Sequence, residues 1–360
     1  MGSASLPSNP WIETPLIESS ALSKAAGCRI FLKLENLQPS GSFKSRGIGA
    51  LLQHSLLNHH NPNVVHFYCS SGGNAGLACV TAARTLNRPA TVVVPLTTKP
   101  LMVAKLRSAG AYEVVQVGEN WQAADTYLQE RLLQNDEGGV YVPPFDHPEI
   151  WEGHSTLVSE VARQLRDQNE EGADAMVCSV GGGGLLCGVL LGLERQHCDW
   201  SKACKVLALE TEGAESLHKS LQQGQLVTLP SITTIATSLG ATRVAQRALD
   251  LAQKHAITSA VLSDAEAAMG CWRFADDERI LVEPACGINL AVCYDGRLKQ
   301  LLPELTPKSK VVIVVCGGSN ITLQTLMAYR NDYGWIERST TNDAEVPSTL
   351  SAPPNGCHVR

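Results

Sequence analysis

The turn that decides the fold reads Ser40-Gly41-Ser42-Phe43-Lys44-Ser45-Arg46-Gly47-Ile48. It follows an apolar segment at residues 30–34 and precedes a run with the character of a helix. A fold can desolvate an amine and lower its pKa where a lysine stands beside an aromatic ring at a helix entrance, as Lys44 does beside Phe43. Such an amine can condense with an aldehyde near neutral pH. On this turn alone the alternative is a solvated lysine, since most lysines are exposed.

The composition is that of an ordinary globular protein and excludes several classes. Of the 360 residues 44% are hydrophobic and 18% are charged, and this length favours two domains. The net charge of −6 leaves no basic field for nucleic acid or an anionic membrane. The 12 cysteines form no C-x-x-C pair, and most stand in apolar segments, which is typical of free thiols in a reducing compartment. Without a targeting signal in residues 1–10 or an apolar run of membrane-spanning length, we expect a cytoplasmic protein.

Short apolar strands alternate with helices along most of the chain. We predict strands at residues 64–69, 91–94, 113–117, 140–142, 175–180, 205–209, 260–262, 279–282 and 311–316. This alternation predicts an α/β protein whose parallel sheets are covered on both faces. The strands form two sets that divide near residues 143–148, which indicates two α/β domains with a cleft between them. Residues 335–360 have the composition of a disordered polar tail.

Three turns that follow predicted strands are rich in small residues, and ligands bind at such turns in open α/β sheets. They read Ser70-Ser71-Gly72-Gly73-Asn74-Ala75-Gly76, then Gly181-Gly182-Gly183-Gly184-Leu185, then Cys316-Gly317-Gly318-Ser319-Asn320. Small residues let backbone N–H groups converge on an anion at a helix N-terminus. Asn74 suits a carboxylate or a ring oxygen, and the four glycines of the second turn suit a phosphate. The Cys316 thiol either faces a ring nitrogen or is simply a small buried side chain.

The tetraglycine turn (Gly181 to Gly184) also leaves a dinucleotide site open. Glu210 ends the next predicted strand, about where a dinucleotide-binding fold places its ribose-binding acid. The turn lacks the G-K-[ST] of a P-loop, and Leu186 or Cys187 stands where G-x-G-x-x-G requires its third glycine. A nicotinamide-dependent dehydrogenase therefore remains an alternative on spacing.

The lysine turn and the three glycine turns, in this order, resemble those of the type II pyridoxal-phosphate (PLP) enzymes. Their particular forms are similar to the catabolic L-serine/L-threonine dehydratases and their serine dehydratase-like branch. The likeness extends over about residues 10–330 and includes Leu281-Val282-Glu283-Pro284-Ala285-Cys286-Gly287. It implies a tryptophan synthase β-like fold, with a large PLP-binding domain of residues 1–45 and 147–334, a small domain of residues 46–146 and the cofactor in the cleft between them. It also implies a homodimer.

By this resemblance Lys44 carries PLP as an aldimine and, once released, removes the Cα proton of the substrate. The resemblance assigns cofactor binding to Phe43, Lys44, Asn74, Gly181, Gly182, Gly183, Gly184, Leu185 and Cys316. It assigns binding of the substrate carboxylate to Ser71, Gly72, Asn74 and Ala75. The implied reaction is the deaminating dehydration of L-serine to pyruvate and ammonia, or of L-threonine to 2-oxobutyrate, through aminoacrylate. Such a lyase serves amino-acid catabolism and gluconeogenesis.

One residue departs from a related branch, and one further ligand is implied. Gly72 occupies the place where related serine racemases carry a serine that acts as the second acid/base, so racemisation is not expected. The resemblance also suggests a monovalent cation, usually potassium, near Glu210, Ala214, Ser216 and Leu239. Two alternatives stay within the PLP-binding proteins: β-replacement, as in cysteine or threonine synthases, and a sensor that keeps PLP without turnover.

Overall fold

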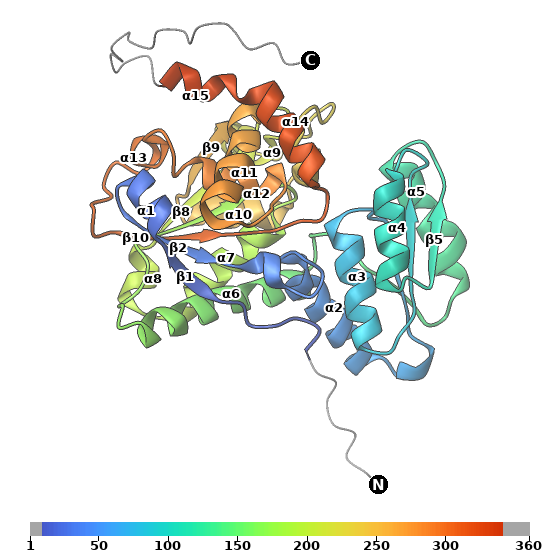
Figure 1. Cartoon of the computed structure of the whole chain (residues 1–360). Coiled ribbons are helices and arrows are strands. Elements are labelled where there is room, and N and C mark those ends of the chain that lie inside the picture. Colours follow the sequence, from blue (N-terminus) through green and yellow to red (C-terminus); the bar gives the residue numbers. More distant parts are fainter. Residues whose placement is uncertain (1–8, 341–360) are drawn as a thin grey trace, which may run out of the picture.

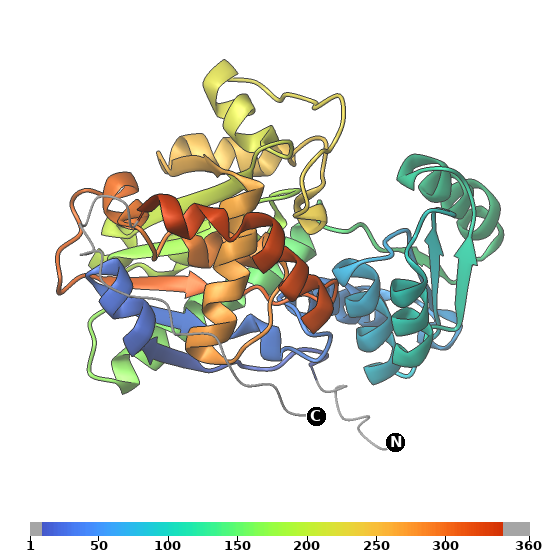
Figure 2. The same ribbon diagram turned by 45° about the horizontal axis from the view of Figure 1, so that its top comes forward.

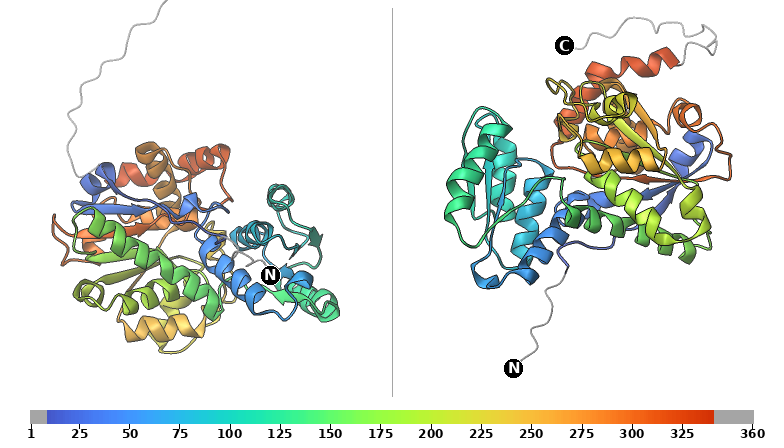
Figure 3. Two further views of the ribbon diagram at one scale, coloured as in Figure 1. Left: turned by 90° about the horizontal axis from the view of Figure 1, so that it is seen from below. Right: turned by 180° about the vertical axis from the view of Figure 1, so that it is seen from behind.

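Strand β10 (Lys310–Val314) lies beside β2 (Arg29–Lys33), so both ends of the described chain contribute to one sheet. The computed structural model describes residues 9–340. The two strands run parallel, and Figure 3 shows the blue N-terminal strands next to the orange C-terminal one. Both are largely apolar, which suits strands that are covered by helices on both faces.

The larger sheet has six strands in the order β1-β2-β10-β7-β8-β9. Its other strands are β1 (Leu16–Ser19), β7 (Ala175–Ser179), β8 (Lys205–Thr211) and β9 (Thr258–Leu262). All neighbours are parallel except β1, which pairs antiparallel with β2. In Figure 1, α6 (Pro148–Asp167) and α7 (Gly184–Gln196) pack together below this sheet, and α11 (Asp264–Glu278) and α12 (Pro284–Ala291) pack together above it. The remaining helices of this lobe are α1 (Ser20–Ala26), α8 (Asp199–Ala203), α9 (Ser216–Gln223), α10 (Gln246–Lys254), α13 (Arg297–Leu301), α14 (Leu323–Tyr333) and α15 (Trp335–Thr340).

The smaller sheet has four parallel strands in the order β5-β4-β3-β6. They are β3 (His66–Cys69), β4 (Ala90–Val94), β5 (Glu113–Gln116) and β6 (Gly139–Tyr141). Helices α3 (Asn74–Thr85), α4 (Pro100–Ala109) and α5 (Trp121–Tyr127) cover it, and α5 continues as a π-helical turn (Leu128–Leu132) and a 3-10 turn (Leu133–Asn135). Figure 2 shows this lobe beside the larger one. Helix α2 (Lys44–Asn58) joins the lobes, because it packs against both α3 and α6.

The structure confirms the predicted fold class, an α/β protein with two mainly parallel sheets. The predicted strand at residues 279–282 is wrong, because Arg279 ends α11 with a φ of 61° and Pro284 opens α12, which leaves a short connection without a strand partner. Helix α6 begins at Pro148, since proline in the first helical turn favours a start there.

The prediction of a disordered tail from residue 335 is wrong for residues 335–340, which form α15. Glu337 in this helix forms ion pairs with Arg273, at 3.3 Å, and with Arg330. Residues 341–360 of the predicted tail lie outside the described residues. The boundaries between the two domains stay a prediction. Within residues 9–340, no helix combines the length and the apolar character needed to cross a membrane.

Candidate active site

Lys44 stands at the first residue of α2, where the larger lobe passes into the smaller one. Its Nζ donates a hydrogen bond to the Pro144 carbonyl at 2.6 Å and lies 5.3 Å from the centre of the Phe43 ring. Burial lowers the pKa of Lys44 to about 8, although the nearby thiols of Cys69 and Cys316 act in the opposite direction. Because Lys44 is half-buried and its Nζ is hydrogen-bonded to a backbone carbonyl, the interpretation of Lys44 as an exposed surface lysine is wrong.

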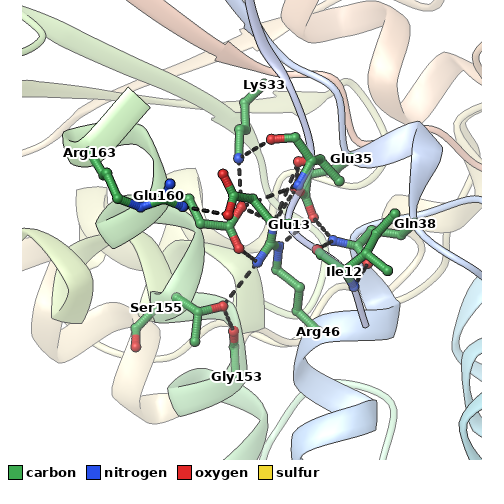
Figure 4. A network of polar contacts seen from close by, with 12 residues as sticks. Ile12, Glu13, Lys33, Glu35, Gln38, Arg46, Gly153, Ser155, Glu160 and Arg163 are labelled. Carbon is green, nitrogen blue, oxygen red and sulfur yellow. Dashed lines mark hydrogen bonds and ion pairs between the residues drawn. The ribbon is translucent and has the colours of Figure 1, made fainter. Parts of the chain in front are cut away.

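A buried ionic network holds the Lys44 turn in place (Figure 4). Arg46, two residues along the helix, is 0% exposed and donates to Glu35 at 2.7 and 2.8 Å and to Glu160 at 2.6 Å. Lys33, also 0% exposed, donates to the same Glu160 at 2.6 Å. A bidentate guanidinium between two carboxylates has a single orientation. The network therefore fixes the first turn of α2 against β2 and α6.

Cys316 follows β10 and faces the Lys44 turn. Its carbonyl accepts from the Phe43 backbone N–H at 3.2 Å, and a β-bridge joins Ser42 to Gly317. The Cys316 thiol is 6% exposed and lies 3.8 Å from Ser179 Oγ and 3.5 Å from Asn289 Nδ2. The thiol thus has two polar neighbours at the carboxyl ends of β7 and β10.

The turn of Ser70 to Gly76 brings Asn74 to the first residue of α3, where it meets the larger lobe. Asn74 Nδ2 donates to Glu283 at 2.6 Å and to Ser238 at 3.3 Å, and its Oδ1 accepts from the Ser319 backbone N–H at 3.0 Å. Ser71 Oγ accepts from the Gly73 N–H at 3.3 Å, and Ala75 is buried. A Cβ on Gly72 would lie 3.0 Å from Thr98 and 3.2 Å from Val94, so a larger residue fits there only if these side chains shift.

The tetraglycine turn lies against the segment that accepts the Lys44 hydrogen bond. Added Cβ atoms on Gly182 and Gly184 would overlap Phe145, the neighbour of Pro144. Gly183 has a φ of 88° and precedes the first residue of α7, so its backbone needs glycine. Gly181 packs against Leu239, and Leu185 is buried at the start of the helix. The structure therefore brings Lys44, Asn74, the tetraglycine turn and Cys316 together around one place.

Glu210 does not face this place in the way a ribose-binding acid would. It is 0% exposed, and its carboxylate accepts from the backbone N–H groups of Leu217 at 2.8 Å and His218 at 2.7 Å. Burial raises the pKa of Glu210 to about 8. Because both oxygens cap the start of α9, the carboxylate is not available for ribose hydroxyls. This removes the main support for the dinucleotide alternative.

The predicted cation residues are only partly brought together. Ala214 lies in the turn between β8 and α9 and Ser216 is the first residue of α9, whereas Leu239 lies beside Gly181. Three buried oxygens between the end of β8 and the start of α9 have no hydrogen-bond partner among the described residues: Thr211 Oγ1, Glu215 Oε2 and Ser216 Oγ. In residues 9–340 there is no cluster of three or more His, Cys, Asp or Glu side chains suited to a metal.

Sequence reasoning missed His154 and Glu283. His154 is 0% exposed, its ring centre is 5.1 Å from that of Phe43, and neither ring nitrogen has a partner among the described residues. Burial lowers the pKa of His154 well below its usual value, and the charges of Lys44 and Arg46 lower it further. For Glu283 the sequence contains a signal, because an acidic residue stands directly before the proline that begins a helix. For His154 it contains none, since nothing in the sequence distinguishes a buried histidine in a helix from an exposed one.

Two mainly parallel sheets, with a buried amine of lowered pKa and a tetraglycine turn between the lobes, are typical of α/β enzymes that bind a cofactor where two lobes meet. The chain belongs to the pyridoxal-phosphate dependent enzymes, whose family pattern matches residues 8–317. It is 47% identical over 326 residues to an L-serine dehydratase/L-threonine deaminase of Bos taurus, covering 90% of this chain and 96% of that protein. It is 46% identical over 328 residues to a serine dehydratase-like protein of Homo sapiens, covering 90% and 95%.

A solved structure supports the same assignment. The fungal L-serine ammonia-lyase from Rhizomucor miehei matches with a TM-score of 0.82 and 40% identity, covering 90% of this chain and 99% of that one. The resemblance inferred from the four turns, the fold class and the PLP cofactor are thereby confirmed.

Proposed function

We propose that this protein is an L-serine/L-threonine ammonia-lyase, which converts L-serine to pyruvate and ammonia and L-threonine to 2-oxobutyrate and ammonia. The observation that carries the proposal is the Lys44 amine, whose pKa is lowered to about 8 beside the tetraglycine turn and Cys316. It is supported by relatives whose names give this activity and of which the chain covers nearly the whole length.

The residues around Lys44 fit PLP. Phe145 packs directly against Gly182 and Gly184, so only glycine fits at these positions. The backbone N–H groups of this turn, at the N-terminus of α7, would bind the phosphate. Phe43, beside Lys44, would flank the pyridine ring, and the Cys316 thiol would face the ring nitrogen. Leu185 would complete the phosphate-binding turn. Asn74 would donate to the oxygen of the ring.

When bound, PLP supplies the electron sink for the charge that develops at Cα. The neutral Lys44 amine takes the Cα proton, and the Pro144 carbonyl accepts a hydrogen bond from this nitrogen at 2.6 Å. Ser71, Gly72 and Ala75, with the backbone N–H of Asn74, lie at the start of α3 and would bind the substrate carboxylate. Gly72 provides no hydroxyl on its face, so the second acid/base that racemisation needs is missing there.

The test is the product pattern of the purified, PLP-loaded protein. We expect equal amounts of ammonia and keto acid from L-serine and from L-threonine, and none from D-serine. The same incubations with added sulfide distinguish β-replacement, which would divert serine into a thiol amino acid. Absence of keto acid from both L-amino acids, and of a thiol amino acid in the incubations with sulfide, would leave the non-catalytic alternative for a protein that binds PLP.

We expect Gly182→Ala to weaken PLP binding about tenfold or more and to lower stability by about 1–3 kcal/mol, because the added methyl group would overlap Phe145 and displace the turn. Absorbance titration of the apoprotein and thermal unfolding measure the two effects. Gly224→Ala is the control for PLP binding only: a Cβ there meets no atom within 4 Å, but the φ of 70° at Gly224 disfavours alanine, so this variant loses stability by itself. If Gly182→Ala binds PLP as tightly as Gly224→Ala does, the turn is not the phosphate site.

Three further properties belong to the proposal. A monovalent cation, potassium, would neutralise the buried Glu210 and satisfy the oxygen of Ser216, with Ala214 and Leu239 as further ligands. The partnerless oxygens around Ser216 support this site. A homodimer and a cytoplasmic location are proposed on the resemblance to the dehydratases.

A further inference from the structure

Glu283 is a buried carboxylate at the meeting of the two lobes, and the proposed reaction leaves it without a role. It is 4% exposed and directly precedes α12. Its Oε1 accepts from Asn74 Nδ2 at 2.6 Å, and its Oε2 accepts from the Asn320 backbone N–H at 3.2 Å. Gly318 has a φ of 113°, and a Cβ there would overlap this carboxylate. The loop after β10 is thus shaped around Glu283.

The carboxylate determines which way the Asn74 amide points. A carboxylate only accepts hydrogen bonds, so it must face the NH₂ group of Asn74 and not its oxygen. The oxygen then faces the Ser319 backbone N–H, at 3.0 Å. One proton of Nδ2 goes to Glu283, and the other has only the long contact of 3.3 Å to Ser238. That second N–H is the donor that remains for a ligand.

The hydrogen bond between Asn74 and Glu283 also connects the smaller lobe to the larger one. Asn74 begins α3 in the smaller lobe, whereas Glu283 lies 209 residues further along the chain. A second hydrogen bond connects the two lobes nearby, because Lys105 of α4 donates to the Ser319 carbonyl. The charge of Lys105 and the hydrogen bonds from Ser238, Asn320 and Asn74 partly offset the burial that raises the pKa of Glu283.

We propose that Glu283 is a positioning residue for Asn74: its ionised carboxylate orients the amide, so that one N–H points at the bound cofactor. This inference rests on the proposed function in placing Asn74 at the cofactor. Both carboxylate oxygens face N–H donors, and hydrogen bonds to an ionised acceptor are stronger than those to a neutral one. Neutralising Glu283 therefore weakens its hold on the Asn74 amide, and with it the binding of the cofactor.

The titratable groups that face Glu283 come from three other helices. They are Lys105 of α4, Cys271 of α11 and Tyr329 of α14. Burial raises the pKa of both Cys271 and Tyr329, so neither changes charge as the pH falls below neutrality. As the pH falls, Glu283, whose pKa burial raises, is thus the group of this cluster that loses its charge.

The experiment titrates apoprotein with PLP and follows absorbance between pH 6 and pH 8.5. We expect Glu283→Gln to bind PLP roughly tenfold more weakly than the wild type at pH 8, since a hydrogen bond to a charged group is lost. The difference should shrink as the pH is lowered, because burial raises the pKa of the wild-type Glu283 carboxyl and its charge is lost at a higher pH than that of an ordinary glutamate. Glu304→Gln, at an exposed carboxylate, is the control and should match the wild type throughout. Affinities of Glu283→Gln within twofold of the wild type at every pH would overturn the proposal.

Asn74→Ala shows whether Glu283 acts through Asn74. We expect Glu283→Gln to cause no further loss of PLP affinity in the Asn74→Ala protein, and a full additional loss would contradict the proposal. If Glu283→Gln does not fold, the single Asn74→Ala variant still tests the proposal. The PLP affinity of Asn74→Ala should change less with pH than that of the wild type, because protonation of Glu283 no longer affects an amide at position 74. A pH dependence equal to that of the wild type would overturn the inference. All readouts are PLP binding, so a protein that binds PLP but releases no keto acid refutes the proposed function without affecting this test.

Discussion

Lys44→Ala protein, purified from cells that contain PLP, is expected to be colourless and to release keto acid from L-serine at least about 10²–10⁴ times more slowly than the wild type. The variant removes the nitrogen that binds the cofactor covalently and takes the substrate proton. Reduction of the wild type with borohydride, followed by peptide mass analysis, should place the cofactor on Lys44. A yellow Lys44→Ala protein, or a label on another lysine, would contradict the assignment.

Two control variants show whether Lys44 acts through its positive charge or through its ability to lose a proton and react. Lys44→Arg keeps a positive charge at the start of α2, but a guanidinium does not lose its proton in proteins. It should therefore be as inactive as Lys44→Ala. Lys308→Ala, at an exposed lysine, should keep colour and activity. Activity in Lys44→Arg would mean that the position supplies only charge.

The pKa of Lys44 gives the same prediction a pH dependence. Since burial lowers this pKa to about 8, the ammonium form predominates below pH 8 and the neutral amine above it. Only the neutral amine attacks an aldehyde, so the rate at which apoprotein takes up PLP should rise through pH 8 and level off above it. Stopped-flow absorbance measures this rate. A midpoint near the ordinary lysine value of about 10.4 would show that the amine is solvated.

The sequence was sufficient to predict the features whose chemistry is local. The four glycines after β7 and the Asn74 turn after β3 each need only a strand, a turn and a helix in succession, and all of these are visible as short patterns. The same is true of Lys44 at the start of α2. The false strand at residues 279–282 shows the limit, because apolar residues before a proline fit a buried connection as well as a strand.

Contacts between distant residues were not predictable. The pairing of β10 with β2 and the hydrogen bond from Asn74 to Glu283 join residues more than 200 positions apart. No periodicity encodes which strand neighbours which, or which acid a given amide meets. The same holds for Arg46, which looks like an exposed charge in the sequence and is fully buried in the structure.

Replacement of Arg46 is expected to have the largest effect on stability. Arg46→Ala would leave Glu35, 0% exposed, and Glu160, 13% exposed, without the guanidinium that they share. Removing one partner of a buried ion pair costs about 3–5 kcal/mol, out of a typical total stability of 5–15 kcal/mol. Urea unfolding at pH 7.5 measures the loss. Arg163→Ala breaks an exposed ion pair with Glu13 on the same face of α6 and should unfold like the wild type.

The pH dependence distinguishes lost charge from lost packing. Burial raises the pKa of Glu160, but hydrogen bonds and charge from Arg46 and Lys33 outweigh burial, so its pKa lies below the ordinary value. A carboxyl with a lowered pKa stabilises the fold above its unfolded pKa, and this contribution is lost as the pH falls through the folded pKa. In Arg46→Ala much of that contribution is already missing. The stability gap between the two proteins should therefore narrow as the pH falls below about 4.3, the ordinary value for glutamate. A gap that stays constant over this range would mean that Arg46 fills space, and that the ionic network does not hold the Lys44 turn.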